Sequence, residues 1–202
     1  MVTDAYRFLI PILLVALALA YFHLPTFALV CLVLAAFVCF FFRNPRREIP
    51  AGEGLVVSPA DGRVVKISPL AEGDGGHMVS IFLNIFDVHV NRSPIQGELE
   101  RLEYKRGKFK AAFYEEASSV NEQNVLTIRG QAIRVIVRQI AGLIARRVVC
   151  WKSAGYAMER GELIGLIRFG SRVDVLLPKE VMLLVKVGEK VKGGSSILGK
   201  YS

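Results

Sequence analysis

Two long apolar runs open the chain, and short alternating segments fill most of the rest. Residues 8–22 (FLIPILLVALALAYF) and 27–42 (FALVCLVLAAFVCFFF) contain no charged residue and are separated by only four residues. Each run is slightly shorter than the roughly 20 residues with which a helix crosses a bilayer alone. We therefore expect a tight helical hairpin and assign residues 1–42 to a hydrophobic membrane anchor.

A cleavable signal peptide is the alternative for this stretch. Such a peptide has a basic start and a small-residue cleavage site, whereas these runs lead directly into RNPRR at residues 43–47. A retained anchor is therefore favoured. By the positive-inside rule, Arg43, Arg46 and Arg47 predict that the following domain lies at the cytoplasmic face of the cell membrane.

After residue 50 the apolar positions alternate over short distances and are punctuated by Gly, Pro and Asp. The clearest alternating segments cover residues 54–67, 78–94, 125–149, 162–178 and 181–199. This spacing is typical of an all-β barrel or sandwich and not of βαβ units. We expect residues 43–202 to form one mainly β domain, with a helical turn or two only at residues 111–119.

Two of these segments, residues 58–65 (SPADGRVV) and 187–194 (VGEKVKGG), look alike. Together they resemble the paired hairpins of the barrel-sandwich hybrid fold of biotinyl and lipoyl domains. The expected fold is therefore a barrel-sandwich-hybrid-like β domain behind the anchor. No carrier lysine is evident at a hairpin tip, and a shared fold does not bring the carrier function with it.

The segment IRFGSRVDV, residues 167–175, has the pattern of an interrupted strand. Ile167, Val173 and Val175 keep the alternation of a half-buried strand, but Gly170 and Ser171 stand in its middle, where strand propensity is poor. A bulge or a close approach of another backbone is the ordinary explanation of such a pair.

Charge and cysteine content narrow the possible partners. The formal net charge is +8, and nearly all of it lies after residue 42, so a domain tethered at a bilayer is expected to meet anionic lipid first. Nucleic acid is not an expected partner, because the basic residues lack interleaved aromatics or a groove-binding helix. The three cysteines form no CxxC pair, so we expect no metal site, and Cys150 is expected in the core.

Polar residues within apolar segments are the candidates for chemistry. Asp61 stands in an Asp-Gly pair, which is most often only a turn. His89 lies in FDVHVNRSP, where it shares strand parity with polar neighbours and could be simply solvated. His23, between the apolar runs, and His77, in a glycine-rich loop, are poor positions for a base.

A set of strings, in order along the chain, carries a family resemblance. The strings are SPADG, FDVHVNRSP, EYKRGKF (103–109), NEQN (121–124), RQIAGLIARRVVCW (138–151) and IRFGSRVDVLLP. Each alone is weak, but the ordered set resembles the short bacterial and archaeal phosphatidylserine decarboxylase proenzymes. The resemblance runs from RNPRR to the end of the chain.

The resemblance implies a zymogen that makes its own pyruvoyl cofactor by autocatalytic cleavage between Gly170 and Ser171. Ser171 Oγ would attack the preceding carbonyl carbon, which needs a strained backbone that glycine tolerates. The products would be a large β chain of residues 1–170 and a small α chain of residues 171–202 that begins with the pyruvoyl group. Gly194-Ser195 is a second such pair, but it follows VGEKVK, where a hairpin turn is expected, and it lacks the flanking strand pattern, so Ser171 is preferred.

The resemblance also implies roles for other residues. Asp61 and His89 match the acid and the histidine that larger relatives use with the serine in self-cleavage. Those relatives carry two histidines three residues apart, whereas here Arg92 stands near the second position. His89 would then combine two duties, or Arg92 would bind the substrate phosphate or carboxylate. Lys105, Arg106 and Lys108 are further candidates for binding the lipid phosphate or an anionic membrane, or they form a solvated strand edge.

The activity implied is a lyase reaction of phospholipid biosynthesis. The amine of phosphatidylserine would form a Schiff base with the pyruvoyl ketone, lose carbon dioxide and leave as phosphatidylethanolamine, with no metal. The expected partners are this lipid and a heterodimer of the two cleavage products, or a dimer of such pairs. Two alternatives stay open: an archaetidylserine decarboxylase acting on ether lipids, and a non-enzymatic membrane-anchored carrier or adaptor with an uncut chain.

Overall fold

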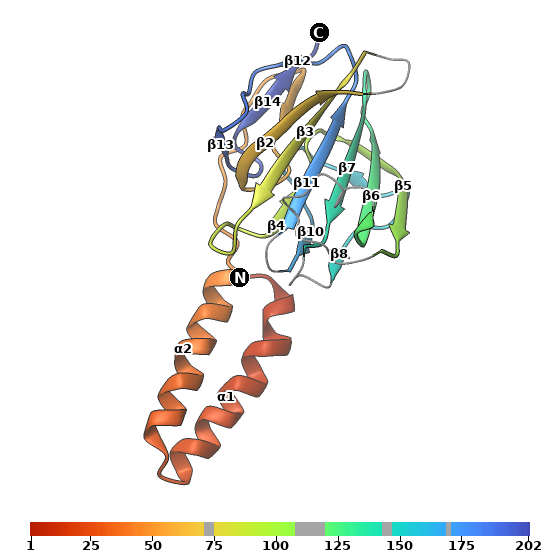
Figure 1. Ribbon diagram of the computed structural model, residues 1–202. Helices are drawn as coiled ribbons and strands as arrows, with labels where there is room; N and C mark the ends of the chain where they lie inside the picture. The colour runs from red at the N-terminus through yellow and green to blue at the C-terminus, as the bar shows by residue number, and fades with distance from the viewer. Residues whose placement is uncertain (71–74, 108–119, 143–146, 169–170) are drawn as a thin grey trace. The chain divides into compact units, whose positions relative to one another are not determined.

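The computed structural model describes residues 1–70, 75–107, 120–142, 147–168 and 171–202. The chain divides into two compact units, Met1–Arg46 and Arg47–Ser202. The first unit is helical and the second is built of β-strands (Figure 1). The predicted fold class, mainly β behind an N-terminal apolar hairpin, is confirmed. The helical turn expected at residues 111–119 lies outside the described residues.

The helical unit contains a short 3-10 turn, η1 (Thr3–Ala5), and two helices, α1 (Tyr6–Tyr21) and α2 (Pro25–Phe41), which pack against each other as a hairpin (Figure 1). The link is shorter than the sequence predicts because α2 starts at Pro25, and the fixed φ of proline suits the first position of a helix. One span, Thr3–Tyr21, is long and apolar enough to cross a membrane, whereas α2 is shorter. Most large apolar side chains of both helices are exposed, which favours an apolar environment over water.

The described residues of the second unit form three antiparallel sheets. The largest, which curls into a half-barrel, has the order β13 (Lys190–Val191), β2 (Gly62–Pro69), β3 (His77–Leu83), β11 (Ser171–Leu177), β7 (Arg134–Ile140), β6 (Gln123–Arg129), β5 (Gly97–Lys105) and β9 (Ala157–Met158). A second sheet has the order β4 (Val90–Arg92), β10 (Leu163–Ile167) and β8 (Val148–Cys150). The third has the order β1 (Leu55–Val57), β14 (Ile197–Lys200) and β12 (Met182–Leu183).

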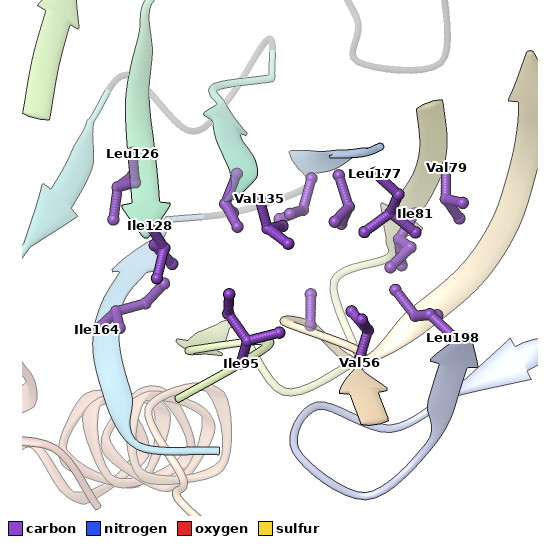
Figure 2. Close-up of a cluster of buried hydrophobic side chains, with 14 of the residues drawn as sticks. Val56, Val79, Ile81, Ile95, Leu126, Ile128, Val135, Ile164, Leu177 and Leu198 are labelled. Atoms are coloured by element: carbon purple, nitrogen blue, oxygen red, sulfur yellow. The ribbon is translucent and has the colours of Figure 1, made fainter. Parts of the chain in front are cut away.

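The hydrophobic core lies between the inner face of the large sheet and the two smaller sheets. In Figure 2, side chains of the large sheet such as Val79, Ile81 and Val135 face Val56 and Ile164 of the smaller sheets. Fully burying an apolar side chain of this size contributes about 1.5–3 kcal/mol relative to exposure. The alternation seen in the sequence therefore places one side of each long strand in this core.

The interruption at Gly170-Ser171 separates two strands of different sheets. β10 ends at Ile167 in the three-stranded sheet, and β11 begins at Ser171 in the eight-stranded sheet. The segment is therefore not one bulged strand, because the chain changes sheets at this point. Gly170 itself lies outside the described residues.

The two similar segments at 58–65 and 187–194 lie side by side. β13 pairs with β2 through Lys190 and Arg63, and Gly194 N–H donates to the Ser58 carbonyl at 2.7 Å. This pairing of two similar hairpins agrees with the expected hybrid-like fold.

A buried ion pair on the outer face of β11 follows the serine directly. Arg172 Nε donates to Asp174 Oδ1 at 2.6 Å, and Arg172 Nη2 donates to Ser80 Oγ of β3 at 2.8 Å. The two charged side chains are only 3% and 0% exposed. Removing one partner of such a pair leaves the other charge buried without compensation.

We expect Asp174→Ala to lower the free energy of unfolding by about 3–5 kcal/mol, since it strands the Arg172 guanidinium. The matched control is Glu98→Ala, which removes an ion pair with Arg129 whose side chains are 43% and 53% exposed and should cost at most about 1 kcal/mol. Urea unfolding of the full chain in detergent, followed by Trp151 fluorescence, measures both. Equal losses in the two variants would contradict the assigned role of the buried pair.

Candidate active site

Ser171 is buried on the inner face of the large sheet. It shares strand parity with Val173, Val175 and Leu177, all of which belong to the core, and its own exposure is 0%. Within the described parts of the chain, Ser171 Oγ has no hydrogen-bond partner. Leaving a buried hydroxyl unbonded costs about 1–3 kcal/mol, so a serine here has no structural advantage over alanine.

His89 lies at the same end of the large sheet as Ser171. The β11–β3 register pairs Ser171 with Leu83, and a turn at residues 84–87 then leads from β3 toward His89. The His89 carbonyl in turn accepts the N–H of Ile167, four residues before Ser171, at 3.2 Å. These two contacts place His89 at the end of the sheet where β11 begins with Ser171.

The His89 ring is buried and held by the backbone. Its exposure is 1%, and Nδ1 lies 3.0 Å from the Asp87 carbonyl oxygen. A proton on Nδ1 donated to this carbonyl makes Nε2 the basic nitrogen of the neutral ring. The polar-face position suggested by strand parity is therefore wrong: the turn at 84–87 delays the strand to Val90, and the ring points into the protein.

Asp61 forms an ion pair that the sequence did not suggest. Both of its carboxylate oxygens accept hydrogen bonds from Arg47 Nη2, at 2.8 Å to Oδ1 and 2.7 Å to Oδ2. Oδ1 also accepts a hydrogen bond from the Gly193 N–H at 2.8 Å. The following Gly62 has φ +147°, and a Cβ there would collide with the Phe82 carbonyl oxygen. The Asp-Gly pair therefore combines a glycine demanded by packing with a carboxylate used for ion pairing.

Arg92 joins the same group. Its backbone N–H donates to the Pro59 carbonyl at 2.9 Å, which sets SPADG beside FDVHVNRSP, and its Nη1 donates to the Gly161 carbonyl at 2.9 Å. Burial and the nearby Arg47 lower the pKa of Arg92, while Asp61 raises it. Asp61 pairs with Arg47, and Arg92 lies close enough to feel both charges, so these three side chains together carry one positive charge, which suits an anion.

Asp61 is not bonded to the other two residues predicted for self-cleavage. In the part of the chain that the structure describes, Asp61 is bonded to neither His89 nor Ser171. Lys105, exposed at the end of β5, pairs in register with Gln123 of β6. Lys108 lies outside the described residues.

A buried amide network near Ser171 was missed by the sequence interpretation. Gln139 Nε2 donates to Asn91 Oδ1 at 2.8 Å, and Asn124 Nδ2 donates to Gln139 Oε1 at 3.2 Å. Gln139 is paired with Val173, so it lies on the same sheet face as Ser171 and one inward-facing position along. Asn91 Nδ2 is buried without an acceptor among the described residues, which leaves a hydrogen-bond donor available in this region.

The sequence did contain signals for these residues. Asn91, Asn124 and Gln139 lie within three of the strings that carry the resemblance, but their contacts join distant strands. Arg47 belongs to RNPRR, for which membrane topology was a sufficient explanation. The structure shows no cluster of metal-ligating side chains in its described parts, and Cys150 packs against the core as expected.

Fold and site together define a mainly β protein that buries a serine, a histidine and an amide network at one end of its main sheet and whose sequence begins with an apolar helix. The phosphatidylserine decarboxylase family model matches residues 34–199. The chain belongs to this family, whose members are decarboxylase enzymes, and the resemblance read from the sequence is thereby confirmed.

Three curated relatives illustrate the similarity, each named phosphatidylserine decarboxylase proenzyme. The protein of Solibacter usitatus (strain Ellin6076) is 52% identical over 176 residues, 87% of this chain and 84% of the relative. That of Syntrophus aciditrophicus (strain SB) is 48% identical, over 86% of this chain and 84% of the relative. That of Magnetococcus marinus (strain ATCC BAA-1437 / JCM 17883 / MC-1) is 44% identical, over 92% and 87%.

We expect Gln139→Leu to lower the free energy of unfolding by about 2–4 kcal/mol, because it strands the amides of Asn91 and Asn124 in the interior. Gln131→Leu, in the exposed β6–β7 hairpin, is the matched control and should change the free energy by no more than about 0.5 kcal/mol. Urea denaturation of the full chain in detergent gives both values. If Gln139→Leu is as stable as its control, the network does not hold this region together.

Proposed function

We propose that this chain converts phosphatidylserine to phosphatidylethanolamine and carbon dioxide at the cytoplasmic face of the cell membrane. The reaction would use a pyruvoyl group made from Ser171 by self-cleavage of the Gly170–Ser171 bond. The observation that carries the proposal is the fully buried Ser171 Oγ, unpartnered among the described residues, at the junction between two sheets. Membership of the family and the proenzyme names of the relatives support it.

The surroundings of Ser171 suit a pyruvoyl group. A ketone at this position would sacrifice no hydrogen bond, because the hydroxyl makes none with the described residues. The Asn91 amide, held by Gln139, supplies a donor on the same side of the sheet. Burial would protect the ketone from water and from unwanted nucleophiles.

Self-cleavage requires three events at Ser171. Oγ attacks the Gly170 carbonyl carbon, and the peptide nitrogen takes up a proton as the bond becomes an ester. Loss of the Ser171 Cα proton then expels the Gly170 carboxylate and leaves a dehydroalanine. Water replaces its nitrogen, which departs as ammonia, and the residue becomes the pyruvoyl group. Nothing in these steps requires a metal.

His89 is the residue we assign to proton transfer in self-cleavage. It is buried at the serine's end of the sheet, and the Asp87 carbonyl favours the tautomer whose Nε2 accepts a proton. Asp61 would act indirectly, since its carboxylate holds Arg47 and neutralises part of the charge beside Arg92.

We assign binding of the substrate phosphate or carboxylate to Arg92, with Lys105 and Lys108 as further contacts for the phosphate.

The two cleavage products would remain one folded unit. The break would fall just before β11, whose seven residues pair with β3 on one side and five of them with β7 on the other. The small chain therefore keeps β11 in the middle of the large sheet, and the two products form a heterodimer. The pyruvoyl ketone would supply an electron sink for loss of the substrate carboxylate.

Ser171→Ala should leave the chain uncut and abolish formation of phosphatidylethanolamine, because it removes the attacking hydroxyl. Conversion of radiolabelled phosphatidylserine in mixed micelles and gel analysis of the chain measure the two effects. Ser195→Ala, in the turn at residues 192–196, is the matched control and should be cleaved and active. A cleaved Ser171→Ala chain would rule out the proposed cleavage site.

His89→Ala should slow self-cleavage by about 10²–10⁴-fold, the usual contribution of a positioned acid or base. Asp61→Asn should slow it less, since it acts through the arginines. His77→Ala, at the opposite end of β3, is the control and should mature at the wild-type rate. The measurement is the time course of the two fragments after cell-free synthesis, and normal maturation of His89→Ala would remove this residue from the step.

A further inference from the structure

The turn between β3 and β4 presents two apolar side chains to solvent. Phe86 is 68% exposed and Ile85 is 40% exposed. The turn is preformed: Asn84 N–H donates to Asp87 Oδ2, and Phe86 N–H donates to Asn84 Oδ1, both at 2.8 Å. We refer to Ile85 and Phe86 as the apolar tip.

The apolar tip lies at the Ser171 end of the large sheet. Lys105, the last residue of β5, is opposite Gln123, the first residue of β6, and Gln123 is opposite Ile140, the last residue of β7. Ile140 is in turn opposite Arg172 of β11, and the neighbouring Ser171 is opposite Leu83, the last residue of β3. All these strand ends therefore lie along one edge of the large sheet. The arrowheads of β3, β7 and β5 point to this edge in Figure 1. The tip follows Leu83 after one residue and is therefore close to the serine's position in the sheet.

Exposed cationic residues occur at the same edge. Lys105 is the last residue of β5 and Arg106 follows it, whereas Arg147 directly precedes β8, which pairs with the last residues of β10. Tyr104, which is 54% exposed, lies between these cations and Glu122. Desolvation and a hydrogen bond with Glu122 raise the pKa of Tyr104, whereas the charges of Arg106 and Arg147 lower it. Two carboxylates of this region already accept hydrogen bonds: Glu122 from Tyr104, and Asp87 from the Asn84 N–H within the turn.

We propose that this edge docks on an anionic lipid bilayer, with the apolar tip inserted among the headgroups and Lys105, Arg106 and Arg147 against lipid phosphates. An exposed apolar pair beside an aromatic residue and a group of cations is the composition that favours a charged membrane interface. The inference rests on the proposed function: the substrate's acyl chains stay in the bilayer while its headgroup must reach the buried Ser171. Docking by this edge shortens that path.

The insertion can be measured in the full chain with one tryptophan. Trp151 is the only tryptophan, so Phe86→Trp in a Trp151→Phe background reports the tip alone. In vesicles of phosphatidylglycerol with brominated acyl chains, we expect its emission to fall at least about twofold relative to unbrominated vesicles, because interfacial side chains reach about 5–10 Å into the headgroup and acyl boundary.

The control for mere proximity to the membrane is Gln131→Trp in the same background. Gln131 lies in the exposed β6–β7 hairpin, at the far end of a seven-residue strand that spans roughly 20 Å. Its emission should be unchanged by bromine. Equal quenching at both positions, or no quenching at position 86, would overturn the docking proposal. If position 86 is not quenched and the apolar tip can be cross-linked between two chains, the tip binds a second copy of the protein instead.

An activity measurement separates this proposal from the proposed function. Phe86→Ser should keep the wild-type rate on a short-chain phosphatidylserine below its micelle concentration, and lose about tenfold or more on the same headgroup in vesicles. Equal rates on vesicles would contradict docking while leaving the decarboxylase intact. A wild-type chain that decarboxylates neither substrate would refute the function, and the quenching at position 86 would still decide the docking.

Discussion

The register of β11 between β3 and β7 is the constraint on which the rest of the structure depends. Because side chains alternate across a strand, a slip of one residue would turn Ser171 outward and bring Arg172 and Asp174 into the hydrophobic core. The Arg172–Asp174 pair lies within β11, whereas the bond from Arg172 to Ser80 of β3 depends on the observed register, in which Asp174 is opposite Ser80. The bond from Arg172 to Ser80 therefore favours this register, in which Ser171 faces inward.

The consequences for chemistry follow from this placement. Ser171 is fully buried, has no hydrogen-bond partner in the described chain, and lies one inward position from an amide network that keeps a donor available. His89 reaches the same end of the sheet through the turn after β3, and the ion pair of Asp61 with Arg47 sits beside Arg92. The same edge carries the apolar tip and exposed cations, so the arrangement suits an enzyme whose substrate is a membrane lipid.

Much of the fold was predictable because it follows from local periodicity. The uncharged runs gave the helical hairpin, and alternation gave the strands, with the break at Gly170-Ser171 marking the change between sheets. The partners of the site residues were not predictable, because they depend on contacts between distant strands. Arg47 meets Asp61 across 14 residues and Gln139 meets Asn91 across 48. The parity of FDVHVNRSP misled for a local reason, since the turn at 84–87 delays the strand and turns His89 inward.

Intact-mass spectrometry of the mature protein, isolated from its native membrane, tests the central claim most directly. The account predicts a large chain that ends at Gly170 with a free carboxylate, and a small chain of residues 171–202. The small chain should be lighter by one ammonia than a peptide that begins with serine, and it should take up hydrogen from borohydride at its first residue. A single unbroken chain, or a small chain with an intact N-terminal serine, would contradict the account.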